Sequence, residues 1–224
     1  LTDVTLLNNG TRGLSANGGT VELTDVTLDD NGASGLRVTG GTVELTDVTL
    51  LNNGDAGVRA TGGGDVTVRR SFVRGNEGGG LDLDGVRFTV ENTVIVDNGR
   101  GDSPPLVGGV VASSPLAGSA FVHNTVVGNR GTLVGGLSCG SSDFPLTQSV
   151  VWGNEGPTDD ATGCTDDGSH VGGADPRLDT DGYHLTAASS CCVDLGADGA
   201  GVPADDIDGQ TRPCGDGFDL GADE

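Results

Sequence analysis

The chain has 224 residues, a formal net charge of −22, 42 glycines and only 3% aromatic residues. So acidic a surface excludes nucleic acid and anionic membrane surfaces as partners, because both require a basic patch. The apolar fraction of 34% is low for a conventional globule, but it suits a solenoid, whose thin core is built from small stacked side chains.

A nine-residue stretch, Leu-Thr-Asp-Val-Thr-Leu-x-x-Asn, recurs from the first residue onward. It occupies residues 1–9, 23–31 and 45–53, and looser copies follow at 68–76, 90–98, 121–129 and 146–154. The asparagines that close the copies are spaced by 22, 22, 23, 22, 31 and 25 residues. A period near 22 residues with short apolar runs predicts a solenoid rather than a packed globule.

Each repeat contains three short apolar runs separated by glycines. Alternation of apolar and polar residues within a run predicts half-buried strands, and the glycines predict turns. We therefore expect an all-β fold, a parallel β-helix of about seven coils over residues 1–156. An inward asparagine at the same turn of every coil can hydrogen-bond to the coils on both sides. The expected structural ladder comprises Asn9, Asn31, Asn53, Asn76, Asn98, Asn129 and Asn154.

Two insertions interrupt the regular spacing at one corner of the predicted coils. The strand after the ladder asparagine begins five residues later in the first four coils, twelve later in the fifth and eight later in the sixth. The extra residues fall in 99–107 and 130–134. Insertions gathered on one edge of a solenoid often mark its binding face, and neutral drift is the alternative.

The outward positions of the second strand carry the candidate catalytic residues. Arg59 and Asp82 occupy one outward column, and Asp84 lies on the next. Glycosidases need two carboxylates at a defined separation, so these residues are candidates for a polysaccharide lyase or hydrolase. A surface ion pair between Arg59 and Asp82 is the simpler interpretation, and we favour it.

A column of carboxylates runs through the first coils. Asp3, Asp25 and Asp47 share one position, and Arg70 takes the next place. Like charges at strand spacing repel, so either water screens them or a cation bridges them. Calcium prefers such oxygen ligands and is the one cofactor we expect.

Two segments in the tail resemble parts of a calcium loop. They are Asp-x-Asp-Gly sequences that begin at Asp179 and Asp206 and place their second carboxylates at Asp181 and Asp208. Neither has the spaced glutamate of an EF-hand, so turns capped by aspartate are the alternative. We also expect Asp208 to pair with Arg212.

All five cysteines lie in the last two-fifths of the chain. They form no Cys-x-x-Cys motif, and the three histidines are not at zinc-ligand spacing. Disulfides in an exported protein are therefore expected, which predicts an extracellular or cell-surface location. Cys139 is expected to bond to Cys164, and either Cys191 or Cys192 to Cys214. Residues 157–224 should form an acidic cap that covers the strand edges of the last coil.

The repeats, for example residues 146–154, resemble right-handed parallel β-helix proteins of the pectate-lyase-like superfamily. The tail resembles the choice-of-anchor Q domain in five segments, residues 175–176, 182–185, 190–196, 206–212 and 219–224. The resemblance implies a bacterial surface or secreted protein. Cys191 stands where that pattern more usually has proline, which leaves the disulfide pairing open.

Three functions are compatible with these patterns. The first is a non-catalytic exported surface or matrix protein, a rigid scaffold for adhesion that binds polysaccharide or a surface protein. The second is a polysaccharide lyase or hydrolase, and the third is a subunit that stacks end to end in an extracellular filament. The regularity of residues 1–66 favours the scaffold, because active sites usually interrupt repeats. No apolar stretch is long enough to span a bilayer. The chain starts inside a repeat without methionine, so we expect a processed or truncated piece.

Overall fold

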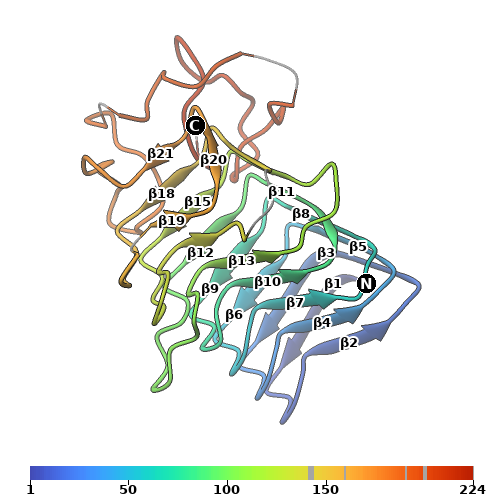
Figure 1. Cartoon of the computed structure of the whole chain (residues 1–224). Coiled ribbons are helices and arrows are strands. Elements are labelled where there is room, and N and C mark those ends of the chain that lie inside the picture. Colours follow the sequence, from blue (N-terminus) through green and yellow to red (C-terminus); the bar gives the residue numbers. More distant parts are fainter. Residues whose placement is uncertain (141–143, 159, 190, 199–200, 224) are drawn as a thin grey trace.

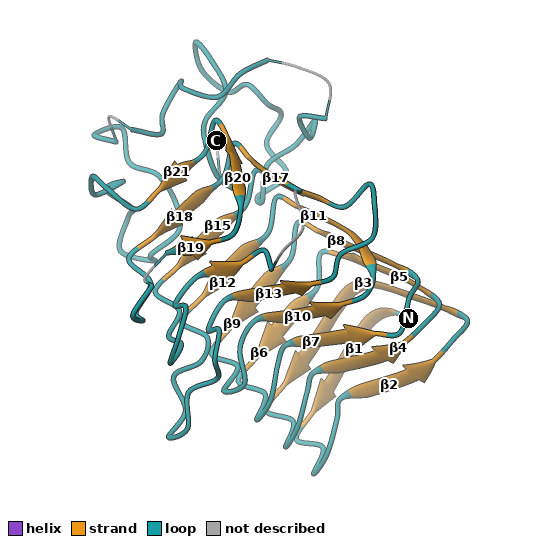
Figure 2. Ribbon diagram, viewed as in Figure 1, coloured by secondary structure: helices purple, strands orange, loops and turns teal. Residues whose placement is uncertain are grey.

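The computed structural model describes residues 1–140, 144–158, 160–189, 191–198 and 201–223. Ser190 and Glu224, which belong to the tail motif, lie outside the described residues. The described part contains strands, turns and loops and no helix (Figure 2). Accordingly, none of the described residues belongs to a helix long and apolar enough to cross a membrane.

The strands form a parallel β-solenoid of about eight turns with three faces (Figure 1). Face A consists of the first half of β3 (Thr20–Asp29), β5 (Thr42–Thr46), β8 (Asp65–Arg69), β11 (Arg87–Glu91), β14 (Ala120–Val122), β17 (Pro145–Thr147) and β20 (Thr165–Asp167). Face B consists of β1 (Thr2–Leu7), the second half of β3, β6 (Thr49–Leu51), β9 (Phe72–Arg74), β12 (Val94–Val96), β15 (Thr125–Val127), β18 (Val150–Trp152) and β21 (His170–Val171). Face C consists of β2 (Leu14–Asn17), β4 (Leu36–Thr39), β7 (Val58–Thr61), β10 (Leu81–Asp84), β13 (Val110–Ser113), β16 (Leu137–Ser138) and β19 (Ala161–Thr162).

Every rung repeats the register of the rung before it, so like residues stack on like. One inward column of face A runs from the second rung to the seventh with no member more than 1% exposed. Its members are Leu23, Leu45, Val68, Val90, Phe121 and Leu146. Alternate residues point outward, which is the period-two pattern of the sequence. The expected fold class is therefore confirmed.

The ladder asparagines stack in the turn that follows face B. The side-chain amide of each donates to the Oδ1 atom of the next over 2.8–3.0 Å, from Asn9 to Asn154. The last of them, Asn154, donates to Asp160 at 3.0 Å. Asn53 is typical: its Oδ1 atom accepts from the backbone N and Nδ2 of Asn31, and its Nδ2 atom also donates to Leu28 O. The expected ladder is thus present, and it satisfies polar groups that the core would otherwise leave without partners.

The coils continue past residue 156, where the sequence predicted that they end. β19, β20 and β21 pair in register with β16, β17 and β18 and add one more rung. This rung is polar, and β20 is exposed along its length, so the apolar pattern that identifies the earlier rungs is missing. The count of about eight turns, against about seven expected, reflects this extra rung.

The tail after β21 does more than cover the last rung, which is the role expected of it. It folds back along face B and packs on outward side chains as far as β9. Tyr183 contacts Phe72 edge to face with ring centroids 5.3 Å apart. Ala222 packs with Val94 and Val96. Further along, Leu220 packs with Val150 and Cys192.

The outward column of face B changes in composition where the tail covers it. It carries threonine in the first three rungs and mostly apolar residues after them. In order the residues are Thr5, Thr27, Thr49, Phe72, Val94, Thr125 and Val150. Strands buried on both faces need apolar residues on both, which explains the runs Val94–Val96 and Val150–Trp152.

Replacing Asn53 with alanine is expected to lower the free energy of unfolding by about 3 kcal/mol or more. The change leaves several buried groups of the neighbouring rungs unsatisfied, at about 1–3 kcal/mol each. Asn9→Ala is the matched control, because Asn9 lies in the exposed first rung. This substitution should lower the free energy of unfolding by less than about 1 kcal/mol. Denaturant unfolding of both variants measures the difference, and equal effects would contradict a buried cooperative ladder.

Candidate functional site

The two insertions lie together and form one structure, which we call the insertion ridge (residues 99–107 and 130–134). Val107 and Val134 form a parallel β-bridge, and the backbone N of Leu133 donates to Leu106 O at 3.0 Å. The ridge stands at the corner between faces B and C. Its crest exposes two large apolar side chains, Leu106 at 69% and Leu133 at 54%. Adjacent exposed leucines of this kind are typical of interaction surfaces.

A groove of about 620 Å³ runs beside the ridge, and we call it the insertion groove. Its lining is charged and glycine-rich: Gly54, Asp55, Arg59, Glu77, Gly78, Arg100, Gly101, Asp102, Ser103 and Pro105. A second hollow of about 290 Å³ adjoins it and shares Arg59 and Pro105. Asp82 and Leu106 also line this hollow, so face C and the ridge together bound one recess.

The candidate catalytic residues lie at this recess, but they are engaged with one another. Arg59 Nε is 2.8 Å from Asp82 Oδ2, and Arg59 Nη1 is 3.0 Å from Asp55 Oδ2. A guanidinium held between two carboxylates can donate hydrogen bonds, but it is not available as a base. Asp84 lies two residues further along β10, between Thr61 and Ser113, and lines neither hollow. The structure therefore brings Arg59 and Asp82 together and leaves Asp84 apart.

The carboxylate column occupies a bend in the backbone between faces A and B. Its residues have positive φ in every rung: Asp3, Asp25, Asp47, Arg70, Asn92, His123 and Gln148. Aspartate and asparagine adopt this left-handed conformation more readily than most residues, which gives the aspartates a structural reason to be there. Arg70 lies over Asp47 with two hydrogen bonds of 2.9 Å, and this bonding, against the effect of burial, raises the pKa of Arg70. In that rung the guanidinium supplies the positive charge beside the carboxylate.

The two tail segments predicted to resemble calcium loops converge on His184. Its Nδ1 atom is 2.5 Å from Asp181, and its Nε2 atom is 2.8 Å from Asp208 and 3.8 Å from Asp223. Burial lowers the pKa of His184, but the hydrogen bonds to Asp181 and Asp208 outweigh it and raise the pKa to about 9. An imidazolium thus sits between the acidic side chains that we had considered as calcium ligands. His184 does not stand out in the sequence, because its two aspartate partners lie 3 and 24 residues away in a tail without a repeat.

The remaining aspartates of these segments cap turns, the alternative that the sequence left open. Asp179 Oδ1 accepts from the backbone N of Thr180 at 2.6 Å. Asp206 is fully buried, and its Oδ1 atom accepts from the backbone N of Asp208 and of Gln210 at 2.9 and 2.7 Å. Calcium at any of these residues stays a prediction.

The expected pair of Asp208 with Arg212 is wrong. Asp208 bonds to His184, whereas Arg212 is buried and donates to Gly221 O at 3.0 Å and to Asn92 Oδ1 at 3.3 Å. Arg212 thereby joins the tail to Asn92 of the carboxylate column.

Burial, helped by the nearby charge of Arg212, lowers the pKa of His123 to about 3, so this ring is neutral in the folded protein near pH 7.

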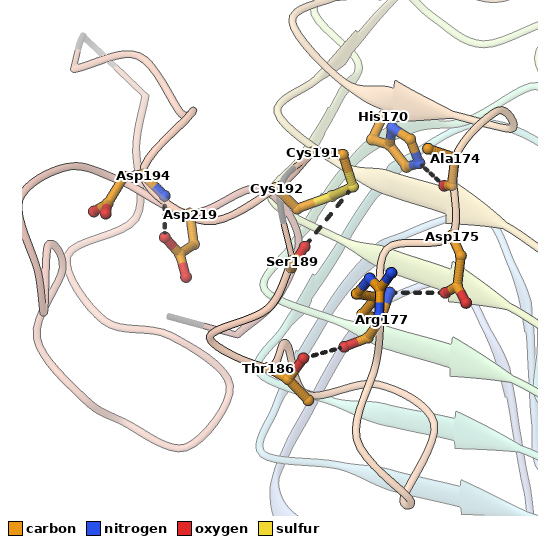
Figure 3. Close-up of a disulfide and its surroundings, with 10 residues drawn as sticks. All are labelled: His170, Ala174, Asp175, Arg177, Thr186, Ser189, Cys191, Cys192, Asp194 and Asp219. Carbon is orange, nitrogen blue, oxygen red and sulfur yellow. Dashed lines mark hydrogen bonds between the residues drawn. A yellow bond between two sulfur atoms is a disulfide. The ribbon is translucent and has the colours of Figure 1, made fainter.

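The disulfides agree with the sequence in part. The bond between Cys139 and Cys164 is confirmed, and it joins residues 25 positions apart near the end of the coils. The expected bond from Cys191 or Cys192 to Cys214 is wrong, because Cys191 and Cys192 bond to each other (Figure 3). The bond therefore joins the two adjacent cysteines that the sequence presents as alternatives for one partner.

Comparison with known proteins gives one match. A family model described as right handed beta helix region matches residues 1–150. No curated protein and no solved structure matches the chain. The match covers the coils through the start of β18, so it concerns the solenoid. The resemblances to the pectate-lyase-like superfamily and to the choice-of-anchor Q domain stay predictions.

The packing of the tail should depend on the charge of His184. Because the fold raises the pKa of His184 from 6.5 to about 9, its stabilising contribution is complete below pH 6.5 and is lost as the pH rises through about 9. Protease cleavage of the tail should therefore accelerate over this range in the wild type. His184→Gln should already be cleaved faster at pH 6.5 and should show a flatter profile; identical profiles would contradict the assignment.

Calcium at about 1 mM should raise the melting temperature if the carboxylates bind it, since a ligand of the folded state stabilises it. Asp25→Asn tests the carboxylate column, and Asp181→Asn tests the aspartates of the tail. The variant that abolishes the shift identifies the site. The absence of a shift in the wild type would exclude calcium from both.

Proposed function

The chain belongs to the right handed beta helix family, and from this premise we propose that it is a non-catalytic, exported scaffold that binds a surface polysaccharide along the insertion groove. The supporting observation is the recess beside the ridge. It is the place where the regular coils are interrupted, and it combines a charged groove with two exposed leucines. An extended ligand lying along face C would meet both.

The chemistry of the groove favours a neutral or amino-bearing polysaccharide. Asp55, Glu77 and Asp102 offer carboxylate oxygens to sugar hydroxyls or ammonium groups. The net charge of −22 would repel an anionic polymer at moderate ionic strength. The exposed side chains of Leu106 and Leu133 offer an apolar surface beside these polar groups.

The ion pairs support a scaffold rather than an enzyme. Arginines of successive rungs pair with carboxylates of their neighbours, as in Arg69 with Glu91 at 2.6 Å and Arg74 with Asp97 at 3.1 Å. Arg59 and Asp82 follow the same pattern at 2.8 Å. The groups that a lyase or hydrolase would use are therefore arranged like the structural pairs elsewhere on the solenoid.

Affinity electrophoresis against neutral, amino-bearing and acidic polysaccharides tests the proposal, together with an assay for new reducing or unsaturated chain ends. We expect retention by a neutral or amino-bearing polymer without turnover. Turnover that Asp82→Ala abolishes would contradict the scaffold and favour the enzyme.

The double variant Leu106→Ser, Leu133→Ser locates the binding site. It should weaken retention by about tenfold, because two leucines that the bound polymer covers in part contribute roughly the 1.4 kcal/mol that a tenfold change requires. Leu116→Ser is the matched control, since Leu116 is 42% exposed and lies in the turn between β13 and β14. Equal loss in both variants would contradict binding at the ridge.

A further inference from the structure

A group of soft metal ligands lies where the last rung meets the tail. The side-chain ligand atoms of His170, Cys191 and Cys192 all lie within 4.8 Å of one another. His170 begins β21, and the two cysteines follow in the tail (Figure 3). In a tetrahedral zinc site with zinc–sulfur bonds of about 2.3 Å, the sulfur atoms are about 3.8 Å apart. The three ligand atoms are therefore close enough to one another to share one ion.

We propose that reduction of the Cys191–Cys192 disulfide creates a zinc site whose ligands are the two cysteine thiolates and His170. The step consumes two electrons and two protons, which convert the sulfur–sulfur bond into two thiols. A dithiol donor supplies both and becomes a disulfide itself. Zinc then displaces the two thiol protons, which are released to water. While the disulfide is intact the sulfurs are not thiolates, so the site binds zinc only in the reduced protein.

One ring nitrogen of His170 is held by the backbone, which leaves the other as a possible metal ligand. Its Nε2 atom lies 2.8 Å from Ala174 O, and a nitrogen that faces a carbonyl oxygen carries the proton. The lone pair is then on Nδ1, and metal-binding histidines commonly donate their other ring N–H to a backbone carbonyl in this manner. The backbone is also fixed, since His170 N donates to Ser149 O at 2.8 Å.

The surroundings suit a complex without net charge. Cys192 is fully buried, and Val150 and Leu220 pack with it, while Trp152 and Leu185 pack against the same cluster. Zinc with two thiolates and a neutral imidazole has no net charge, so burial costs little compared with an isolated ion. Cys191 is only partly buried, which leaves a route for zinc and for a water molecule as fourth ligand.

Two other groups serve as internal comparisons. The Cys139–Cys164 disulfide yields two thiols on reduction, but no histidine or carboxylate joins these cysteines in a cluster among the described residues. His184 clusters with Asp208 and Asp223, which provide nitrogen and oxygen ligands and no sulfur. A sulfur-containing spectroscopic signature therefore distinguishes the proposed site from the second cluster.

Cobalt(II) is the probe, because it replaces zinc and its bond to thiolate gives a charge-transfer absorption in the near ultraviolet. The whole chain is reduced with a phosphine, freed of reductant without oxygen, and titrated with cobalt. We expect a thiolate-to-cobalt band that saturates at one equivalent and disappears when zinc is added. The oxidised protein should show no such band. No band after reduction, or a band in the oxidised protein, would overturn the proposal.

Variants assign the ligands. Cys191→Ser, Cys192→Ser and His170→Gln should each reduce cobalt affinity by at least about tenfold, in the range typical for losing a ligand or its support. The double variant Cys139→Ser, Cys164→Ser, the variant Cys214→Ser and the variant His184→Gln should leave the band unchanged. Loss of the band in any of these three controls, or an unchanged cobalt affinity in Cys191→Ser, would contradict the assignment. The comparison of oxidised with reduced wild type decides the question even where a variant fails to fold.

Discussion

Rung-on-rung hydrogen bonding is the constraint on which the whole molecule depends. The backbone and the ladder asparagine of each rung must hydrogen-bond to the next rung in the same register, because a shifted rung would leave buried amides without partners. The chain meets this requirement from Asn9 to Asn154 with side-chain bonds of 2.8–3.0 Å. Additional residues can be accommodated only where they leave the stack, which is why the insertions project at one corner as the ridge.

The same constraint gives the acidic residues of the carboxylate column a structural role. The bend between faces A and B needs a left-handed residue in every rung, and Asp3, Asp25 and Asp47 meet that need. Where the tail covers this bend, the residues change to Asn92, His123 and Gln148, which are buried and contact the tail or lie beneath it. The tail thus divides the solenoid into a covered flank along face B and an open edge at the ridge, and the open edge carries the proposed function.

Periodic features of the structure were predictable, and the contacts of the tail were not. The inward columns, the ladder and the Cys139–Cys164 bond follow from residues that recur one rung apart, so their spacing along the chain gives their position in space. The tail has no repeat, so its partners depend on how it folds back. His184 meets Asp208 at a separation of 24 residues, and Arg212 meets Asn92 across 120 residues. The sequence does contain one sign of the flank that the tail covers: at outward positions of face B, Phe72 and Val94 replace the threonine of earlier rungs. The polar eighth rung was missed because its strands lack the apolar alternation.

Hydrogen exchange of the asparagine side-chain amides, followed residue by residue by NMR, tests the central claim most directly. If the rungs stack as described, the Nδ2 protons of Asn53, Asn76 and Asn98 exchange at one common slow rate, because they are released only when the solenoid opens. The Nδ2 protons of the exposed Asn9 should exchange much faster. Rates for Asn53, Asn76 and Asn98 that match those of Asn9 would contradict a buried ladder and the solenoid built on it.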